Sequence, residues 1–262
     1  AGLGAGAGVL AAATCRGGRT GEDRCAGATA TIDAVWDADA RLALQQRLGG
    51  ADQLVGESTA LLDDHRRRWR QAARDVCEQS SWPRELRARG EACLADRLRG
   101  FAAVVEVLMT TPADHVVGAA LAPASLAAAA TCADVDHLLS RPAPTTPTTL
   151  EDEVRRDLAH AEALVSAGRG RELAVSIDAI ATRARELPAL TAALLRVRAA
   201  IAAGAQAYDE AARLLIDAYF AARRIGDDEL AVTATADLIR VLGVDRARHA
   251  DAAEWVRHGL AD

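Results

Sequence analysis

The residues of this chain best placed to do chemistry are cysteines, and that chemistry is disulfide formation. Cys25 and Cys77 lie at nearly equal sequence distances from a Gly-Gly-Ala turn at 49–51. That turn separates two segments, 26–47 and 53–79, whose apolar residues recur with helical spacing. Residues equidistant from the turn of an antiparallel helical hairpin lie side by side, because both helices rise equally per residue. The spacing therefore predicts a Cys25–Cys77 disulfide, which requires a Cα separation of about 6 Å.

A second cysteine pair obeys the same rule. Cys93 and Cys132 are centred on a turn at 110–112, between predicted helices over 84–110 and 114–131. We therefore predict a Cys93–Cys132 disulfide as well. Structural disulfides persist in oxidising compartments. The two pairs together predict that this region lies outside the cytoplasm.

Other roles for the cysteines remain open. Pro123 is expected to interrupt or kink the helix over 114–131, which weakens the equal-arm argument for the second pair. Free thiols are also common in helical cores. Cys132 and His137 could begin a zinc site, but the other cysteines lie far away in sequence, so we predict no metal. Cys15 is expected to stay unpaired.

Residues 1–24 are expected to be the end of an apolar segment followed by a polar stalk. The first fourteen, AGLGAGAGVLAAAT, carry no charge and are all small or apolar. A bilayer-spanning helix needs about 20 such residues, so this run would suit the outer end of a transmembrane helix. A trimmed signal peptide and a disordered tail are the alternatives. We expect attachment to a membrane through this segment, with the rest of the chain on its extracytoplasmic side.

Composition narrows the class of protein. The 262 residues are 50% hydrophobic and only 3% aromatic, with alanine, leucine and arginine prominent, as in packed amphipathic helices. The net charge of −6 gives no reason to expect nucleic-acid binding. All basic residues are arginine, so a P-loop lysine, a kinase nucleotide lysine and a Schiff-base lysine are impossible within these residues. No HExxH or GxSxG pattern occurs, and we predict no enzyme activity and no cofactor.

Three further features each have a structural and a functional interpretation. His65 lies on an apolar helix face, which favours a core histidine over a ligand or base. The arginines at 66–68 and Arg70 could form an anion or partner patch, although a solvated helix face is the commoner case. The acidic run at 227–229 favours a helix N-terminus.

A proline- and threonine-rich stretch, SRPAPTTPTT at 140–149, separates two predicted helical regions. The cysteine-containing region covers 25–139, and 150–262 forms the second. Thr148 and Glu151 have the spacing of a capping box that begins the second region. Six helices are predicted there, near 149–167, 170–186, 189–204, 207–224, 228–242 and 246–260.

These six helices are predicted to form three pairs of about forty residues each. In the second pair, the helix near 207–224 matches the second helix of a tetratricopeptide repeat. It has an aromatic–acidic–Glu–Ala start and small residues on one face. Its predicted packing residues are Tyr208, Ala211, Leu215 and Ala218. Weaker copies occur at 167–172 and 252–255. The fold class predicted for the whole chain is all-α, with disulfide-tied antiparallel helical hairpins followed by a short tetratricopeptide-like helical-repeat solenoid.

The order of cysteines and tryptophans supports a family resemblance. The motifs are Cys25, Val35-Trp36-Asp37, Trp69, Val76-Cys77, Cys93-Leu94, Cys132-Ala133-Asp134, the proline-rich spacer and the Ala-Gly-Arg at 167–169. This series resembles the region that follows the transmembrane helix in bacterial membrane-anchored serine/threonine protein kinases with tetratricopeptide repeats. The resemblance implies an upstream cytoplasmic kinase domain, anchoring in a bacterial inner membrane and an outer, extracytoplasmic region for signal transduction. No kinase motif occurs in these residues, so no catalytic residue is carried over.

The expected function is a non-catalytic sensor or protein-interaction region of such a kinase. Helical repeats expose a long concave surface, where we expect a protein or peptide partner. The alternative is a free-standing helical-repeat scaffold or adaptor protein without a kinase.

Overall fold

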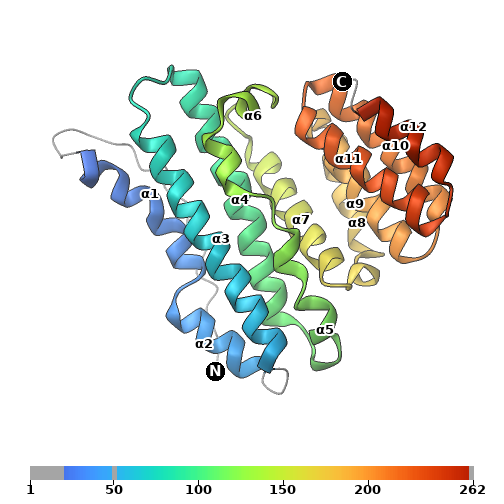
Figure 1. Ribbon diagram of the computed structural model, residues 1–262, viewed down its shortest axis with the longest axis horizontal. Helices are drawn as coiled ribbons and strands as arrows, with labels where there is room; N and C mark the ends of the chain where they lie inside the picture. Colours follow the sequence, from blue (N-terminus) through green and yellow to red (C-terminus); the bar gives the residue numbers. More distant parts are fainter. Residues whose placement is uncertain (1–20, 49–51, 260–262) are drawn as a thin grey trace.

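The protein is all-α (Figure 1), and the computed structural model describes residues 21–48 and 52–259. No strand occurs in these two ranges. The α-helices are α1 (Gly21–Val35), α2 (Ala38–Arg47), α3 (Asp52–Glu78), α4 (Arg84–Thr110), α5 (Val116–Ala119), α6 (Val135–Leu139), α7 (Thr149–Ser166), α8 (Ser176–Ala184), α9 (Thr191–Gly204), α10 (Tyr208–Ile225), α11 (Asp228–Arg240) and α12 (His249–Gly259).

The predicted Cys25–Cys77 disulfide is confirmed and ties α1 to α3. The S–S distance is 2.02 Å and the Cα atoms are 5.8 Å apart. The predicted single helix over 26–47 is wrong, because it divides into α1 and α2. Asp37 begins α2 as its N-cap by accepting a hydrogen bond from the Ala40 amide at 2.8 Å. The predicted turn at 49–51 lies outside the described residues.

The predicted Cys93–Cys132 disulfide is also confirmed, with a Cα separation of 5.4 Å. The helix predicted over 114–131, however, is wrong. The chain there forms short turns, namely η1 (Ala113–His115), α5, η2 (Ala122–Ser125) and η3 (Ala129–Ala133), before α6. Pro123 has no amide hydrogen to donate and lies in the first turn of η2. The second pairing is therefore correct although its arms are not two equal helices.

The same stretch contains the one candidate membrane span found among the described residues. Val116–Ala133 has a mean hydropathy of 1.7 over 18 residues, which is long and apolar enough to cross a bilayer by composition. One third of it is buried inside the protein. It is divided among α5, η2 and η3 and does not form one continuous helix. In this fold the stretch packs against α3, α4 and α7.

Beyond residue 148 the chain forms three helical pairs, α7 with α8, α9 with α10 and α11 with α12 (Figure 1). A 3₁₀ turn, η4 (Gly170–Leu173), precedes α8, and another, η5 (Pro188–Leu190), precedes α9. A π-helical turn, η6 (Val241–Asp245), follows α11. Gly168 and Gly226 have positive φ angles of 73° and 69°, which end α7 and α10 in the left-handed conformation that glycine adopts without strain.

The predicted packing residues of α10 lie at its contacts with neighbouring helices. Ala211 and Ala218 are fully buried and Leu215 is 2% exposed, whereas Tyr208 is half-buried. Ala211 and Leu215 belong to an apolar cluster shared with α9, α11 and α12. The small side chains allow these helices to approach closely.

A continuous apolar core joins the cysteine-containing helices to the first helical pairs. It extends from Ile32 to Val197, and so it includes residues on both sides of the non-helical stretch at 142–148. The buried apolar side chains of α10, α11 and α12 form two separate clusters. The division into domains at 140–149 stays a sequence-based prediction.

Candidate functional site

A cavity of about 360 Å³ lies between α4 and the first helices of the three pairs, α7, α9 and α11. We call it the inter-layer cavity. Helix α4 runs alongside α7 (Figure 1), and its residues line the cavity together with residues of α7, α9 and α11. The volume of the inter-layer cavity lies in the range of small-molecule sites, which is about 300–1,000 Å³.

One part of the cavity wall is apolar. Val104 on α4, Leu126 after η2 and Leu158 on α7 contribute the larger side chains. Ala159 and Ala163 extend this wall along α7. Such a surface favours a ligand with a hydrocarbon portion, because burying apolar area releases about 25 cal/mol per Å².

The rest of the wall is charged. Its guanidinium groups belong to Arg97, Arg99, Arg141, Arg155 and Arg196. Its carboxylates belong to Asp96, Glu162, Asp227 and Glu229. Guanidinium groups thus outnumber carboxylates in the lining by one.

Asp96 on α4 joins three of these arginines. Its carboxylate lies 2.7 Å from Nη2 of Arg141, 2.6 Å from Nη1 of Arg99 and 3.9 Å from Nη1 of Arg155. Burial alone would raise the pKa of Asp96, but the guanidinium groups of Arg141 and Arg99 lower it overall. Asp96 is therefore a permanent anion at neutral pH.

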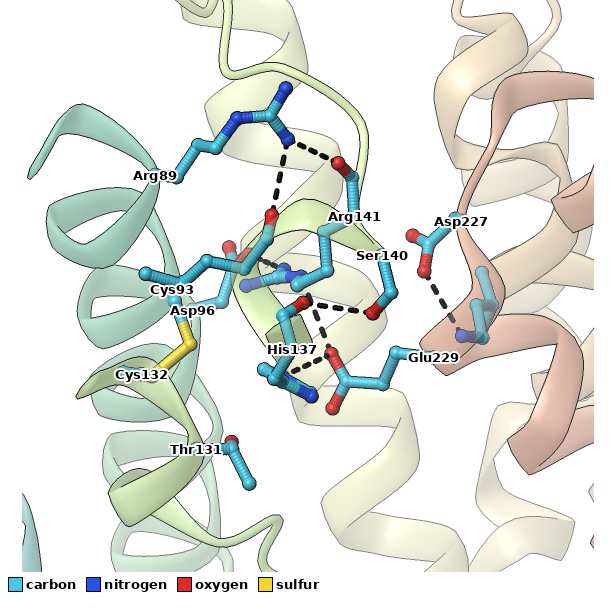
Figure 2. A network of polar contacts seen from close by, with 12 residues as sticks. Arg89, Cys93, Asp96, Thr131, Cys132, His137, Ser140, Arg141, Asp227 and Glu229 are labelled. Carbon is cyan, nitrogen blue, oxygen red and sulfur yellow. Dashed lines mark hydrogen bonds and ion pairs between the residues drawn. A yellow bond between two sulfur atoms is a disulfide. The ribbon is translucent and has the colours of Figure 1, made fainter. Parts of the chain in front are cut away.

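Glu229 on α11 joins the helical pairs to the cysteine-containing helices. Its carboxylate forms an ion pair with Arg97. Its Oε2 lies 3.3 Å from Nε of Arg141 and 3.5 Å from Nε2 of His137 (Figure 2). We call Glu229, Arg97, Arg141, His137 and Asp96 the Glu229 network. In this network, the Asp96 carboxylate of α4 contacts Arg141. The Glu229 carboxylate of α11 contacts both Arg97 and Arg141.

The residues before Glu229 begin α11. Asp227 caps the helix by accepting a hydrogen bond from the Leu230 amide at 3.0 Å, which confirms the structural role predicted for the acidic run. Burial raises the pKa of the Asp227 carboxyl group. The Asp228 amide donates to the Ser140 carbonyl at 2.9 Å, so the main chain also links α11 to the segment after α6.

The Cys93–Cys132 disulfide lies beside the Glu229 network (Figure 2). Cys93 precedes Asp96 on α4 by about one turn, and Cys132 leads into α6, which carries His137. Arg89 on α4 donates to the carbonyls of Leu138, at 3.1 Å, and of Arg141. The disulfide and Arg89 together hold the segment that positions His137 and Arg141.

His65 lies in the core, as expected. It is 8% exposed and stacks on Phe101 with ring centroids 5.2 Å apart and an interplanar angle of 9°. Its Nε2 is buried without a hydrogen-bond partner. Desolvation by burial, followed by the positive charge of Arg97, lowers the pKa of His65 to about 4. The imidazole is therefore neutral at physiological pH.

The arginine-rich face of α3 is largely paired within the molecule. Arg66 and Arg70 contact Asp33, while Arg67 and Arg68 contact Asp64. This pairing agrees with a solvated helix face. The zinc alternative is excluded for Cys132, because its sulfur is in a disulfide. In residues 21–48 and 52–259 no group of three or more His, Cys, Asp or Glu side chains could hold a metal ion.

The disulfides were predictable from the sequence, but the cavity was not. Arg97 and Arg141 were not singled out, because each occurs among many arginines and neither has a motif around it. Glu229 was recognised only as part of an acidic helix start. The N-terminal apolar run proposed to contact the membrane lies outside the described residues.

Comparison of the chain with protein families, with curated proteins and with solved structures finds no match.

Proposed function

We propose that this chain is an extracytoplasmic, non-catalytic binding region of a membrane-anchored serine/threonine protein kinase. The single observation that carries the proposal is the inter-layer cavity, which is lined by residues of α4, α7, α9 and α11. Binding at this face would change the packing of α11 against the cysteine-containing helices. That change is the signal that the region would pass towards the membrane.

Two further observations support the proposal. The two disulfides favour an oxidising compartment, since thiol-reducing systems keep cytoplasmic cysteines reduced. The ordered cysteine and tryptophan motifs support the attachment to a kinase through family resemblance. A free-standing scaffold or adaptor would share the helical pairs but would need neither a membrane segment nor a kinase domain.

The side of the membrane can be tested with one engineered cysteine. Val175 is 87% exposed, so Val175→Cys in a Cys15→Ser background adds an accessible thiol. A membrane-impermeant maleimide should label this thiol in intact cells, and a permeant maleimide serves as the matched positive control. Labelling only after lysis would contradict the proposed location.

The kinase attachment is tested separately by the coding sequence upstream of Ala1. A kinase domain followed by an apolar span of about 20 residues is the expected result. A start codon close to Ala1, with no kinase domain, would favour the scaffold alternative.

A further inference from the structure

The Glu229 network provides the polar connection between α11 and the cysteine-containing helices. The buried apolar residues of α11 pack against α9, α10 and α12 rather than against α4. The contacts of α11 with Arg97, Arg141 and His137 all go through the single carboxylate of Glu229. Apart from the hydrogen bond from the Asp228 amide to the Ser140 carbonyl, the polar contacts of the described residues that tie α11 to α4 and to the segment after α6 go through a carboxylate that another anion could replace.

The guanidinium groups around Glu229 are suited to anion exchange. The side chains of Arg97 and Arg141 are 11% and 18% exposed, so water screens them poorly. Guanidinium groups bind carboxylate and phosphate oxygens in the same planar, bidentate manner. The Asp96 carboxylate lies 2.7 Å from Nη2 of Arg141. This ion pair would hold Arg141 in place after the Glu229 side chain moved away.

The size and lining of the cavity limit the class of ligand. The cavity volume of about 360 Å³ is near the lower end of the range for small-molecule sites. The apolar wall of Val104, Leu126 and Leu158 lies in the same cavity as Arg97 and Arg141. A small molecule with an anionic group at one end and a hydrocarbon body at the other complements both parts.

We propose that the inter-layer cavity binds a small organic anion whose carboxylate or phosphate group replaces the Glu229 carboxylate on Arg97 and Arg141. Glu229 is then an internal competitor of the ligand. Its displacement frees the start of α11 from the cysteine-containing helices. This inference rests on the proposed binding function and names its ligand class.

Three probes of similar length test the charge and the type of anion. Hexanoate and hexyl phosphate each carry an anionic group on a six-carbon chain, and hexylammonium carries a cation on the same chain. Isothermal titration of the oxidised whole chain at low ionic strength should detect binding of one or both anions, and their comparison distinguishes carboxylate from phosphate. Binding of hexylammonium as tight as that of either anion would overturn the proposal.

Variants test whether Glu229 competes with the ligand. Glu229→Gln should bind the anion about fivefold more tightly, because the internal competitor is removed. Arg141→Gln should bind it at least about tenfold more weakly. The matched control is Asp157→Asn, which breaks an ion pair with Arg183 outside the cavity and should leave the affinity unchanged. Weaker binding by Glu229→Gln would show that Glu229 does not compete.

A measurement on the unaltered protein covers the case in which a variant does not fold. Displacement of Glu229 should break the hydrogen bond from the Asp228 amide to the Ser140 carbonyl. Exchange of the Asp228 amide hydrogen should therefore become faster when the anion binds. Slower exchange, or no anion binding at all, would overturn this inference. The proposed location is tested separately, because labelling of Val175→Cys from outside the cell does not depend on anion binding.

Discussion

Burial determines the protonation state of His65. The imidazole stacks on Phe101 in the core and has no hydrogen-bond partner for Nε2. Its pKa of about 4 lies below the ordinary value of 6.5. Between pH 6.5 and about 4, His65 is therefore protonated in the unfolded chain but neutral in the folded protein. The stability due to neutral His65 is present above pH 6.5 and is lost as the pH falls towards 4.

This linkage predicts a measurable pH dependence. Between pH 7.5 and 4.5 the free energy of unfolding should fall by roughly 2–3 kcal/mol more in the wild type than in His65→Leu. Urea unfolding at the two pH values measures the difference. The exposed His249, changed to leucine, is the control and should retain the wild-type pH dependence. Equal losses in the wild type and His65→Leu would contradict a neutral buried imidazole.

Single residues differed in how far sequence could predict their roles. The apolar helical spacing around His65 was enough to place it in the core. The cap at Asp227 was also predictable, because N-caps depend on residues within one turn. The pairing of Glu229 with Arg97 was not, since 132 positions separate them and either could have paired with many other charged side chains.

The start of α7 is defined by a hydrogen bond to the side chain of its N-cap residue, Thr148. Thr148 begins α7 by accepting a hydrogen bond from the Glu151 amide at 3.1 Å, as half of the predicted capping box. The Glu151 carboxylate contacts Arg155 at 2.7 Å instead of returning to the Thr148 amide. The cap is therefore formed by the threonine side chain.

Loss of this cap should destabilise the protein modestly. Thr148→Ala should lower the free energy of unfolding by about 1 kcal/mol, because one amide at the start of α7 loses its partner. Thr149→Ala, one residue later on the exposed surface, is the control and should change stability by less than about 0.5 kcal/mol. Both values come from urea unfolding. Equal effects of the two substitutions would show that the cap contributes nothing specific.

Elements were predictable where apolar spacing was long and regular. Helices α7, α9, α10, α11 and α12 match the expected segments, and Gly168 and Gly226 follow the ends of α7 and α10. The helix expected near 170–186 is wrong in extent, because this stretch forms the 3₁₀ turn η4 and the shorter helix α8. The stretch over 114–131 was not predictable as turns, because its alanines and valines suit a helix as well as a buried loop. Pro123 signalled an interruption, but the packing of the segment against α3 and α4 decided its path.

The two disulfides stabilise the molecule as a whole. The Cys25–Cys77 bond closes a loop with a sequence separation of 52, and Cys93–Cys132 one of 39. On the chain-entropy model, loops of this size each contribute up to about 4 kcal/mol. Cys25→Ala with Cys77→Ala should therefore lower the free energy of unfolding by up to that amount in urea titrations. Cys15→Ala is the control, and an equal loss there would contradict the assignment.

The arrangement of the whole molecule could be predicted only in part. The all-α class and both disulfides followed from spacing along the chain. The inter-layer cavity depends on how α4 packs against α7, and that packing arises from a core that extends across residues 142–148. Nothing in the local pattern of the linker indicated that helices on its two sides would share one core.

The central claim is that this region is an exported, disulfide-tied binding region. Peptide mass spectrometry under non-reducing conditions, on protein isolated from the envelope of its own cells, tests that claim most directly. We predict peptides linked through Cys25–Cys77 and through Cys93–Cys132. Four free thiols at these positions would contradict it.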